Sequence, residues 1–168
     1  MIIFREDKRA LIVIDLQNGV GPLVNNADLI KRVNKRINYY HSHNKPIIFI
    51  RHSDQGLEKN SYDWQLVDDL ETNSQDYYVD KTHADSFHNT NLQTVLDELK
   101  VNELEICGAE IPYCIDATIK AAFDRGYKLF MSRGTVSSEN DESIPFPILV
   151  EHYEKIWNHR FVEFIDEE

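Results

Sequence analysis

The sequence predicts an α/β protein built as a three-layer sandwich, in which a six-stranded parallel, Rossmann-like sheet carries helices on both faces. Short apolar runs rich in β-branched residues, which suit strands buried on both faces, alternate with segments whose apolar residues recur at helical spacing. The connections are rich in glycine, proline and asparagine, as loops are. Strands are expected at 9–16, 45–51, 76–81, 104–109, 127–132 and 160–165, and helices at 28–43, 90–100, 114–125 and 146–157.

The first part of the chain supplies two strands and one long helix. RALIVIDL (9–16) and KPIIFIR (45–51) are nearly continuous apolar runs. Between them, a loop with glycines, a proline and asparagines leads to a helix whose N-cap is Asn25 or Asn26. The basic run KRVNKR (31–36) is interpreted as the solvent-facing side of this helix. Its apolar stripe is formed by Leu29, Ile30, Val33, Ile37 and Tyr40.

The rest of the chain continues the alternation. DYYVDK (76–81) is a less apolar third strand, and LEICGA (104–109) is a buried fourth strand. The helix after the fourth strand is expected to end at Gly126, a residue suited to a left-handed C-cap. Because crossovers between parallel strands are right-handed, the functional site should lie at the carboxyl ends of the strands.

Length and composition limit the function classes. The 168 residues suit one domain, 1–168, and a net charge of −11 without a basic cluster argues against nucleic-acid binding. No stretch approaches the roughly 20 apolar residues of a membrane span, and the first residues lack the pattern of a signal peptide. Two cysteines, Cys107 and Cys114, are too few for a disulfide framework, which favours a reducing cytoplasm.

Three reactive side chains follow three of the predicted strands. Asp15 lies near the end of the first strand, Lys81 ends the third, and Cys114 opens the helix after the fourth. Each residue alone is unremarkable, but together they can supply a nucleophile with its acid and base. A helix N-terminus and an ammonium group both favour a thiolate, so we expect a lowered pKa for Cys114. Cys107, inside an apolar strand, is expected to fill the core.

Four segments carry a resemblance to a known family. They are ALIVIDLQNG, RHSD, DKTHADSFHNTNLQTVLDEL and LEICGAEIPYCIDATIKAAFDRGYKLF. In this order the chain resembles the isochorismatase-like cysteine hydrolase superfamily, which includes nicotinamidases, carbamoylsarcosine amidases and isochorismatases. The resemblance covers residues 10–130 and implies the same six-stranded parallel fold. It also implies a catalytic triad of Asp15, Lys81 and Cys114.

The same resemblance implies an oxyanion hole formed by the backbone N–H groups of Glu110 and Cys114, with a cis peptide bond between Ala109 and Glu110. It further implies a homo-oligomer, either a dimer or a larger assembly. Metal-dependent relatives carry an Asp-x-His element and a further histidine before the lysine strand. This chain lacks that pattern, so we expect neither a metal nor another cofactor.

The chain departs from the family pattern beside the proposed nucleophile. Ile111 and Pro112 stand where the family often has a threonine and a polar residue, and Arg133 follows a strand that usually ends in an aspartate. These changes concern the rim of the pocket or its support and leave the triad intact.

Six residues are candidates for the pocket wall, namely Gln17, His52, Trp64, Phe87, Ile111 and Tyr113. Several have a structural alternative: a loop hydrogen bond for Gln17, a satisfied structural histidine for His52, core packing for Phe87, and packing under the helix for Tyr113. The walls are expected to come from loops near 17–25, 52–63 and 82–90.

Three functions remain open at this level. The leading one is a cysteine hydrolase that cleaves a small amide or a related C–N bond through a thioester. The alternative is a vinyl-ether hydrolase, in which Asp15 acts as the acid and no thiol is needed. The third is a binding homologue that kept the fold and lost activity, which Ile111, Pro112 and Arg133 favour and the intact triad argues against. The expected partner in each case is a small molecule.

Overall fold

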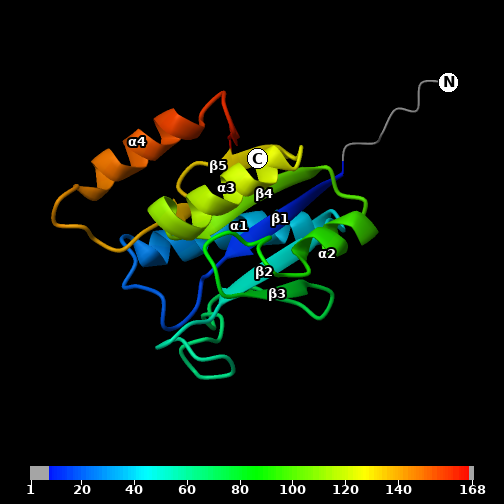
Figure 1. The fold of residues 1–168 in the computed structure, drawn as a ribbon, viewed down its shortest axis with the longest axis horizontal. Helices are drawn as coiled ribbons and strands as arrows, with labels where there is room; N and C mark the ends of the chain where they lie inside the picture. Colours follow the sequence, from blue (N-terminus) through cyan, green and yellow to red (C-terminus); the bar gives the residue numbers. More distant parts are fainter. Residues whose placement is uncertain (1–7, 167–168) are drawn as a thin grey trace.

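A parallel β-sheet runs through the middle of the computed structural model, which describes residues 8–166 (Figure 1). The main strands lie in the order β3-β2-β1-β4-β5-β7, and all are parallel, which confirms the predicted fold class. A seventh strand, β6, spans two residues and pairs with β4; so short a strand leaves no pattern in the sequence. The strands are Arg9–Ile14 (β1), Ile47–His52 (β2), Tyr77–Lys81 (β3), Glu103–Ala109 (β4), Lys128–Ser132 (β5), Val136–Ser137 (β6) and Glu163–Ile165 (β7).

Helices cover both faces of the sheet and bury two separate apolar layers. Helix α1 packs on one face, where Val33 and Ile37 meet Val13 of β1. Helices α2, α3 and α4 pack on the other face, where Ile119 and Trp157 join the same layer as β1 and β4 residues. Within residues 8–166, no helix combines the length and apolar character that a membrane crossing needs. The helices are Asn26–Ser42 (α1), Leu92–Glu98 (α2), Asp116–Asp124 (α3) and Phe146–Trp157 (α4).

The helix predicted at 114–125 is divided into two parts. Residues Ile111–Ile115 form a π-helical turn, η1, and α3 begins only at Asp116. The N–H groups of Tyr113 and Ile115 both donate to the C=O of Glu110, at 3.1 and 3.2 Å. Cys114 therefore lies inside a widened turn, and not at the first residue of a regular helix as the sequence analysis expected.

One glycine allows β4 to lie close to β1. Gly108 pairs with Ile14 and has a φ of 118°, a conformation that side-chain-bearing residues rarely adopt. A Cβ atom at this position would lie 2.1 Å from the carbonyl oxygen of Ile14. Gly108 thus allows the backbones of β1 and β4 to lie close together, so the residues that follow the two strands also lie near each other.

The basic run of α1 does not face solvent throughout, which corrects our interpretation of KRVNKR. Arg36 is buried and forms a paired ion bridge with Glu105 of β4, through Nε at 2.7 Å and Nη2 at 2.9 Å. Tyr40 and Ser132 donate to the same carboxylate, each at 2.9 Å. A buried carboxylate needs such partners, so Glu105 draws Arg36 inward and fastens α1 to the central strand.

Removing the guanidinium should therefore cost more than removing an exposed charge from the same helix. We expect Arg36→Met to lower the free energy of unfolding by about 3–5 kcal/mol, because it leaves Glu105 buried without its cation. Urea denaturation would measure this. The matched control is Lys31→Met, an exposed residue of α1, with an expected change of about 0.5 kcal/mol or less. Equal effects of the two substitutions would contradict the assignment.

Candidate active site

Three side chains that lie at or beyond the ends of separate strands, Asp15, Lys81 and Cys114, meet at the carboxyl edge of the sheet. Lys81 Nζ lies 2.9 Å from Asp15 Oδ2 and 3.2 Å from Cys114 Sγ. Asp15 and Lys81 are 3% and 2% exposed, while Cys114 is half-buried. The structure thus brings together the three residues that the sequence analysis singled out, with the ammonium between the carboxylate and the thiol.

Asp15 reaches this point because the chain turns directly after β1. The φ of Asp15 is 54°, in the left-handed region, which aspartate tolerates better than most residues. Its N–H still donates to the carbonyl of Ile50 at 3.1 Å, which ties the turn to β2. The strand consequently ends at Ile14, two residues before its predicted end.

Lys81 reaches Asp15 from two strands away. It is the last residue of β3 and pairs with His52 of β2, which lies between β3 and β1. Its side chain is completely buried as it passes the end of β2. The carbonyl of His83, in the loop after β3, accepts a further hydrogen bond from Nζ at 3.0 Å. The length of a lysine stem is what allows an edge strand to serve a site beside β1.

His52 orients the ammonium. Its Nδ1 lies 2.9 Å from Lys81 Nζ, and an ammonium can only donate, so Nδ1 is the acceptor. The other ring nitrogen, Nε2, lies 3.1 Å from Asp54 Oδ2 and acts as a donor to it. His52 is thus a positioning residue for Lys81, and it also lines the cavity described below.

The electrostatics of Cys114 differ from our expectation. Burial and the neighbouring Asp15 carboxylate raise the pKa of Cys114 to about 12, and Lys81 opposes this only in part. Burial also raises the pKa of Asp15, against the attraction of Lys81. The expected lowering is wrong because it weighed the helix end and the ammonium without the desolvation and the carboxylate. The resting nucleophile is therefore a thiol, beside Asp15 and Lys81.

Asp15, His52 and Cys114 also form a donor set that a metal ion could in principle use. A carboxylate oxygen, a ring nitrogen and Sγ all lie within 4.8 Å of one another. However, the same three side chains already surround Lys81 Nζ at 2.9 to 3.2 Å. The ammonium of Lys81 thus occupies the position that a metal ion would take. These residues therefore do not fit a metal while Lys81 stays there.

The turn between β4 and the cysteine has the backbone form that the resemblance implied. The peptide bond between Ala109 and Glu110 is cis. Glu110 and Cys114 both line a cavity of about 270 Å³ at the carboxyl edge of the sheet.

This cavity is the space into which Cys114 opens. Besides Asp15, His52 and Cys114, it is lined by residues 19–21, Asp54, Gly56, Leu57, Glu110, Tyr113 and Glu139. Two of the three loops expected to form the walls, 17–25 and 52–63, are therefore present. The third loop, 82–90, does not line the cavity. It packs against α3 instead, where the hydroxyl groups of Ser86 and Thr118 are hydrogen-bonded to each other.

Of the six pocket candidates, only His52 and Tyr113 line this cavity, and Tyr113 is 62% exposed. Gln17 is buried and uses its amide to bridge the backbones of His52 and Trp64. Trp64 is buried under Arg51, which stacks over its ring at 4.1 Å. Phe87 and Ile111 belong to the apolar core. For these four the structure supports the packing role, because their side chains are already enclosed by protein.

Two residues that line the cavity, Asp54 and Glu139, were not singled out from the sequence. Glu139 lies on the loop after β6, and nothing in the sequence near it indicates proximity to Cys114. The departures at Pro112 and Arg133 lie outside the triad: Pro112 lines an adjoining groove, and Arg133 forms an ion pair with Glu154 of α4.

Comparisons with known proteins identify the family of the chain. The isochorismatase domain family matches residues 9–146. A crystal structure of an isochorismatase family protein superposes with a TM-score of 0.91 at 37% identity, covering 94% of this chain and 97% of that one. An uncharacterised isochorismatase family protein of Bacillus subtilis, YddQ, is 28% identical over 70% of this chain and 71% of its own length. Nicotinamidase 3 of Arabidopsis thaliana is 25% identical over 79% of this chain and 75% of its own length.

The family match covers most of the chain and includes all three residues that meet at the carboxyl edge of the sheet. The relatives include proteins named as a nicotinamidase and as a ureidoacrylate amidohydrolase. The chain therefore belongs to the isochorismatase family and is a hydrolase.

Proposed function

We propose that the protein hydrolyses a small amide, or a related C–N bond, through a thioester on Cys114. The observation that carries this proposal is the position of Cys114 Sγ, which faces the cavity while contacting the ammonium of Lys81 next to Asp15. A cysteine needed only for packing would not require a buried acid–base pair beside it. The similarity to a nicotinamidase supports amide chemistry.

The first half of the reaction forms the thioester. Cys114 Sγ attacks the amide carbon as its proton passes to Asp15, which has one buried oxygen, Oδ1, without a hydrogen-bond partner in the structure. The negative charge moves to the carbonyl oxygen, where the N–H groups of Glu110 and Cys114 would stabilise it. Asp15 then returns the proton to the nitrogen, the C–N bond breaks and an amine or ammonia leaves.

The second half regenerates the enzyme. The oxygen of a water molecule attacks the thioester carbon while Asp15 takes a proton from that water. The C–S bond breaks, the proton goes to Cys114 Sγ, and a carboxylic acid is released. Asp15 ends each half as the carboxylate with which it began, and the two halves together return Cys114 to its thiol.

The raised pKa values suit a transfer within the pair. Burial penalises the charged form of both groups and raises the pKa of Asp15 and of Cys114. A thiolate at Cys114 is therefore not favoured before the substrate binds. Asp15 with a raised pKa is a stronger base than an exposed aspartate, and Lys81 stabilises whichever of the two carries the negative charge. The proton is therefore expected to move as Sγ attacks.

A vinyl-ether hydrolase using Asp15 as the acid is the second candidate. Vinyl-ether hydrolysis would give the contact between Lys81 and Cys114 no role in the reaction. Amide hydrolysis is therefore the favoured function. A binding protein without activity would leave the same contact, and the buried Asp15, unexplained.

The two enzymatic candidates differ in what they require of Cys114. In a screen of small amides, we expect the wild-type protein to accumulate an acyl adduct on Cys114, detected by mass spectrometry of the peptide. Cys114→Ala should lose at least about 10³-fold in kcat/KM, because the covalent route is gone. Full turnover by Cys114→Ala on any substrate found would instead support the vinyl-ether route. Cys107→Ala is the matched control, since Cys107 is buried in the core, and it should keep its turnover.

The charge of Asp15 should be visible in the titration of Cys114. We expect Asp15→Asn to lower the pKa of Cys114, because it removes the carboxylate that raises this pKa and leaves Lys81 in place. The measurement is the ultraviolet absorbance of the thiolate against pH, after subtraction of the same curve for Cys114→Ala. Only the pH range in which circular dichroism shows a folded protein is used.

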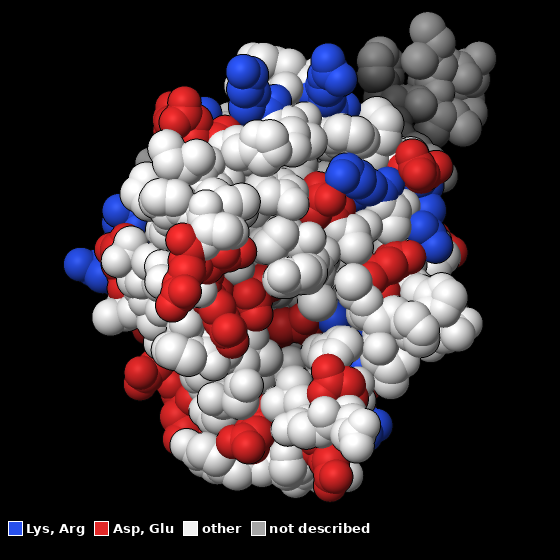
Figure 2. Space-filling model, turned by 60° about the vertical axis from the view of Figure 1, so that its left-hand side comes forward, with Lys and Arg blue, Asp and Glu red and all other residues white. Residues whose placement is uncertain are grey.

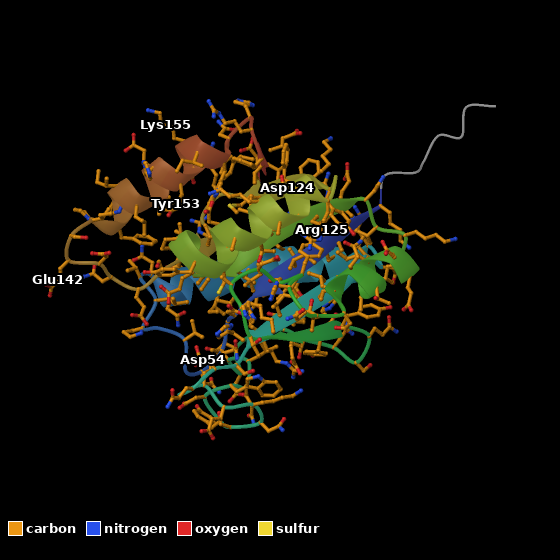
Figure 3. The ribbon with its side chains drawn as sticks, viewed as in Figure 1. Asp54, Asp124, Arg125, Glu142, Tyr153 and Lys155 are labelled. Atoms are coloured by element: carbon orange, nitrogen blue, oxygen red, sulfur yellow. The ribbon has the colours of Figure 1, made fainter. Side chains whose placement is uncertain are left out.

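The matched control for this titration is Asp124→Asn, an exposed residue of α3 labelled in Figure 3. Its curve should follow that of the wild type, with little thiolate well below pH 12. A thiolate that already forms near neutral pH in the wild type would contradict the proposed resting state.

A further inference from the structure

The cavity at Cys114 adjoins a second and larger hollow. A groove of about 720 Å³ lies between η1, the loop 138–144 and α4. Glu110, Tyr113 and Glu139 line both spaces, so a ligand reaching from the groove to Cys114 would pass these three side chains. The groove also offers apolar surface, because Ile148 is 53% exposed and Tyr113 is 62% exposed.

Both spaces carry acidic side chains. Among the described residues that line them, none is Lys or Arg, whereas five carboxylates outside the triad take part: Asp54, Glu110, Glu139, Asp141 and Glu142. Figure 2 brings the left-hand side of Figure 1 forward and shows acidic side chains gathered around a hollow in that face. In Figure 3, Glu142 and Asp54 are labelled on two separate loops of the same side.

None of these five carboxylates forms an ion pair with a lysine or arginine within residues 8–166. The carboxylate of Asp54 pairs with His52. The next acidic group inward is Asp15, 3% exposed, whose Oδ1 has no hydrogen-bond partner although it lines the cavity. Negative charge thus runs from the groove to the floor of the cavity, and Lys81 is the cation that balances it at the floor.

Glu110 is fixed where the two spaces meet. Its Oε2 accepts hydrogen bonds from Ser138 Oγ at 2.8 Å and from the N–H of Glu139 at 3.2 Å. These donors hold the carboxylate on the wall and leave its second oxygen outside those two hydrogen bonds. A fixed carboxylate with an accessible oxygen is a good partner for an ammonium or guanidinium group.

We propose that the substrate is an organic cation, an amide whose ammonium or guanidinium group binds Glu110 and Glu139 while its carbonyl lies at Cys114. The aliphatic part of the substrate would lie along Tyr113 and Ile148. The amide part of this inference rests on the proposed function, whereas the preference for positive charge rests on the lining alone. An anionic substrate such as isochorismate would meet like charge along the whole entrance.

A first experiment measures the charge preference without any catalysis. Cys114 is allowed to react with a cationic thiol reagent, aminoethyl methanethiosulfonate, and with an anionic one, sulfonatoethyl methanethiosulfonate. The ratio of the two rates is divided by the same ratio for mercaptoethanol. We expect the corrected ratio to favour the cation by about 10-fold or more at low salt and to fall as salt is added, since charged clefts steer ligands by about 10- to 10³-fold. Peptide mass spectrometry assigns the label to Cys114 and not to Cys107.

Variants test which carboxylates are responsible. Glu110→Gln and Glu139→Gln should each reduce the corrected ratio severalfold, and together they should bring it near one. The matched control, Glu151→Gln on the exposed side of α4, lies outside both spaces and should leave the ratio unchanged. Circular dichroism checks that each variant is folded. A wild-type ratio near one, or a preference for the anion, would overturn the inference.

A second experiment separates this inference from the proposed function. Three amides of matched length, the cation δ-aminovaleramide, the neutral hexanamide and the anion glutaramate, are compared in kcat/KM. We expect the cation to be preferred by about 10-fold over the neutral amide, with the preference reduced severalfold in Glu139→Gln and lost when Glu110→Gln is added. Turnover of all three without preference would overturn the cationic substrate and leave amide hydrolysis standing. A preserved reagent ratio without turnover or an adduct from any amide would support a cationic ligand and overturn amide chemistry.

Discussion

The site depends on one buried ammonium. Lys81 Nζ contacts Asp15, Cys114, His52 and the carbonyl of His83, all between 2.9 and 3.2 Å. An isolated buried carboxylate would be costly, and a thiolate beside it still more so. With the ammonium between them, one negative charge can stay in the pair and move from one member to the other. Every element that shapes the edge of the sheet, including the left-handed turn at Asp15 and the widened turn at Cys114, serves to bring a group within reach of Nζ.

That arrangement needs a rigid floor, which the central strands supply. Gly108 lets β4 approach β1, so that Asp15 and the turn after β4 emerge side by side. Behind them, Glu105 ties β4 to α1 through Arg36 and to β5 through Ser132. The hydrogen bonds of the buried Arg36–Glu105 pair and those of the Lys81 ammonium share no residue. A mutation in the first can therefore be read as a stability effect and one in the second as a chemical effect.

The sequence was sufficient for the fold and for the proximity of Asp15, Lys81 and Cys114, because both follow from simple periodic rules. Apolar runs mark buried parallel strands, and the ends of parallel strands share an edge, so Asp15, Lys81 and Cys114 had to come near one another. Arg36 was assigned to the solvent-facing side because the helical pattern does not show that Glu105, in the apolar strand β4, packs against this helix. Glu139 was missed because it comes close to Cys114 only through the tertiary course of the chain after β5. The pKa of Cys114 needed the burial and the exact neighbours, which spacing alone does not give.

If the protein has the proposed function, the acidic lining at Glu110 and Glu139 and the raised pKa of Cys114 act together. Negative charge along the cavity disfavours a thiolate, so an enzyme with this lining would keep its nucleophile protonated while no substrate is bound. A cationic substrate would reverse that balance, because it brings positive charge into a partly buried space where Coulomb interactions are stronger than in water. Binding would then favour charge separation between Cys114 and Asp15 only when a carbonyl is present to be attacked. Recognition of the substrate's charge and activation of the thiol would be the same electrostatic event.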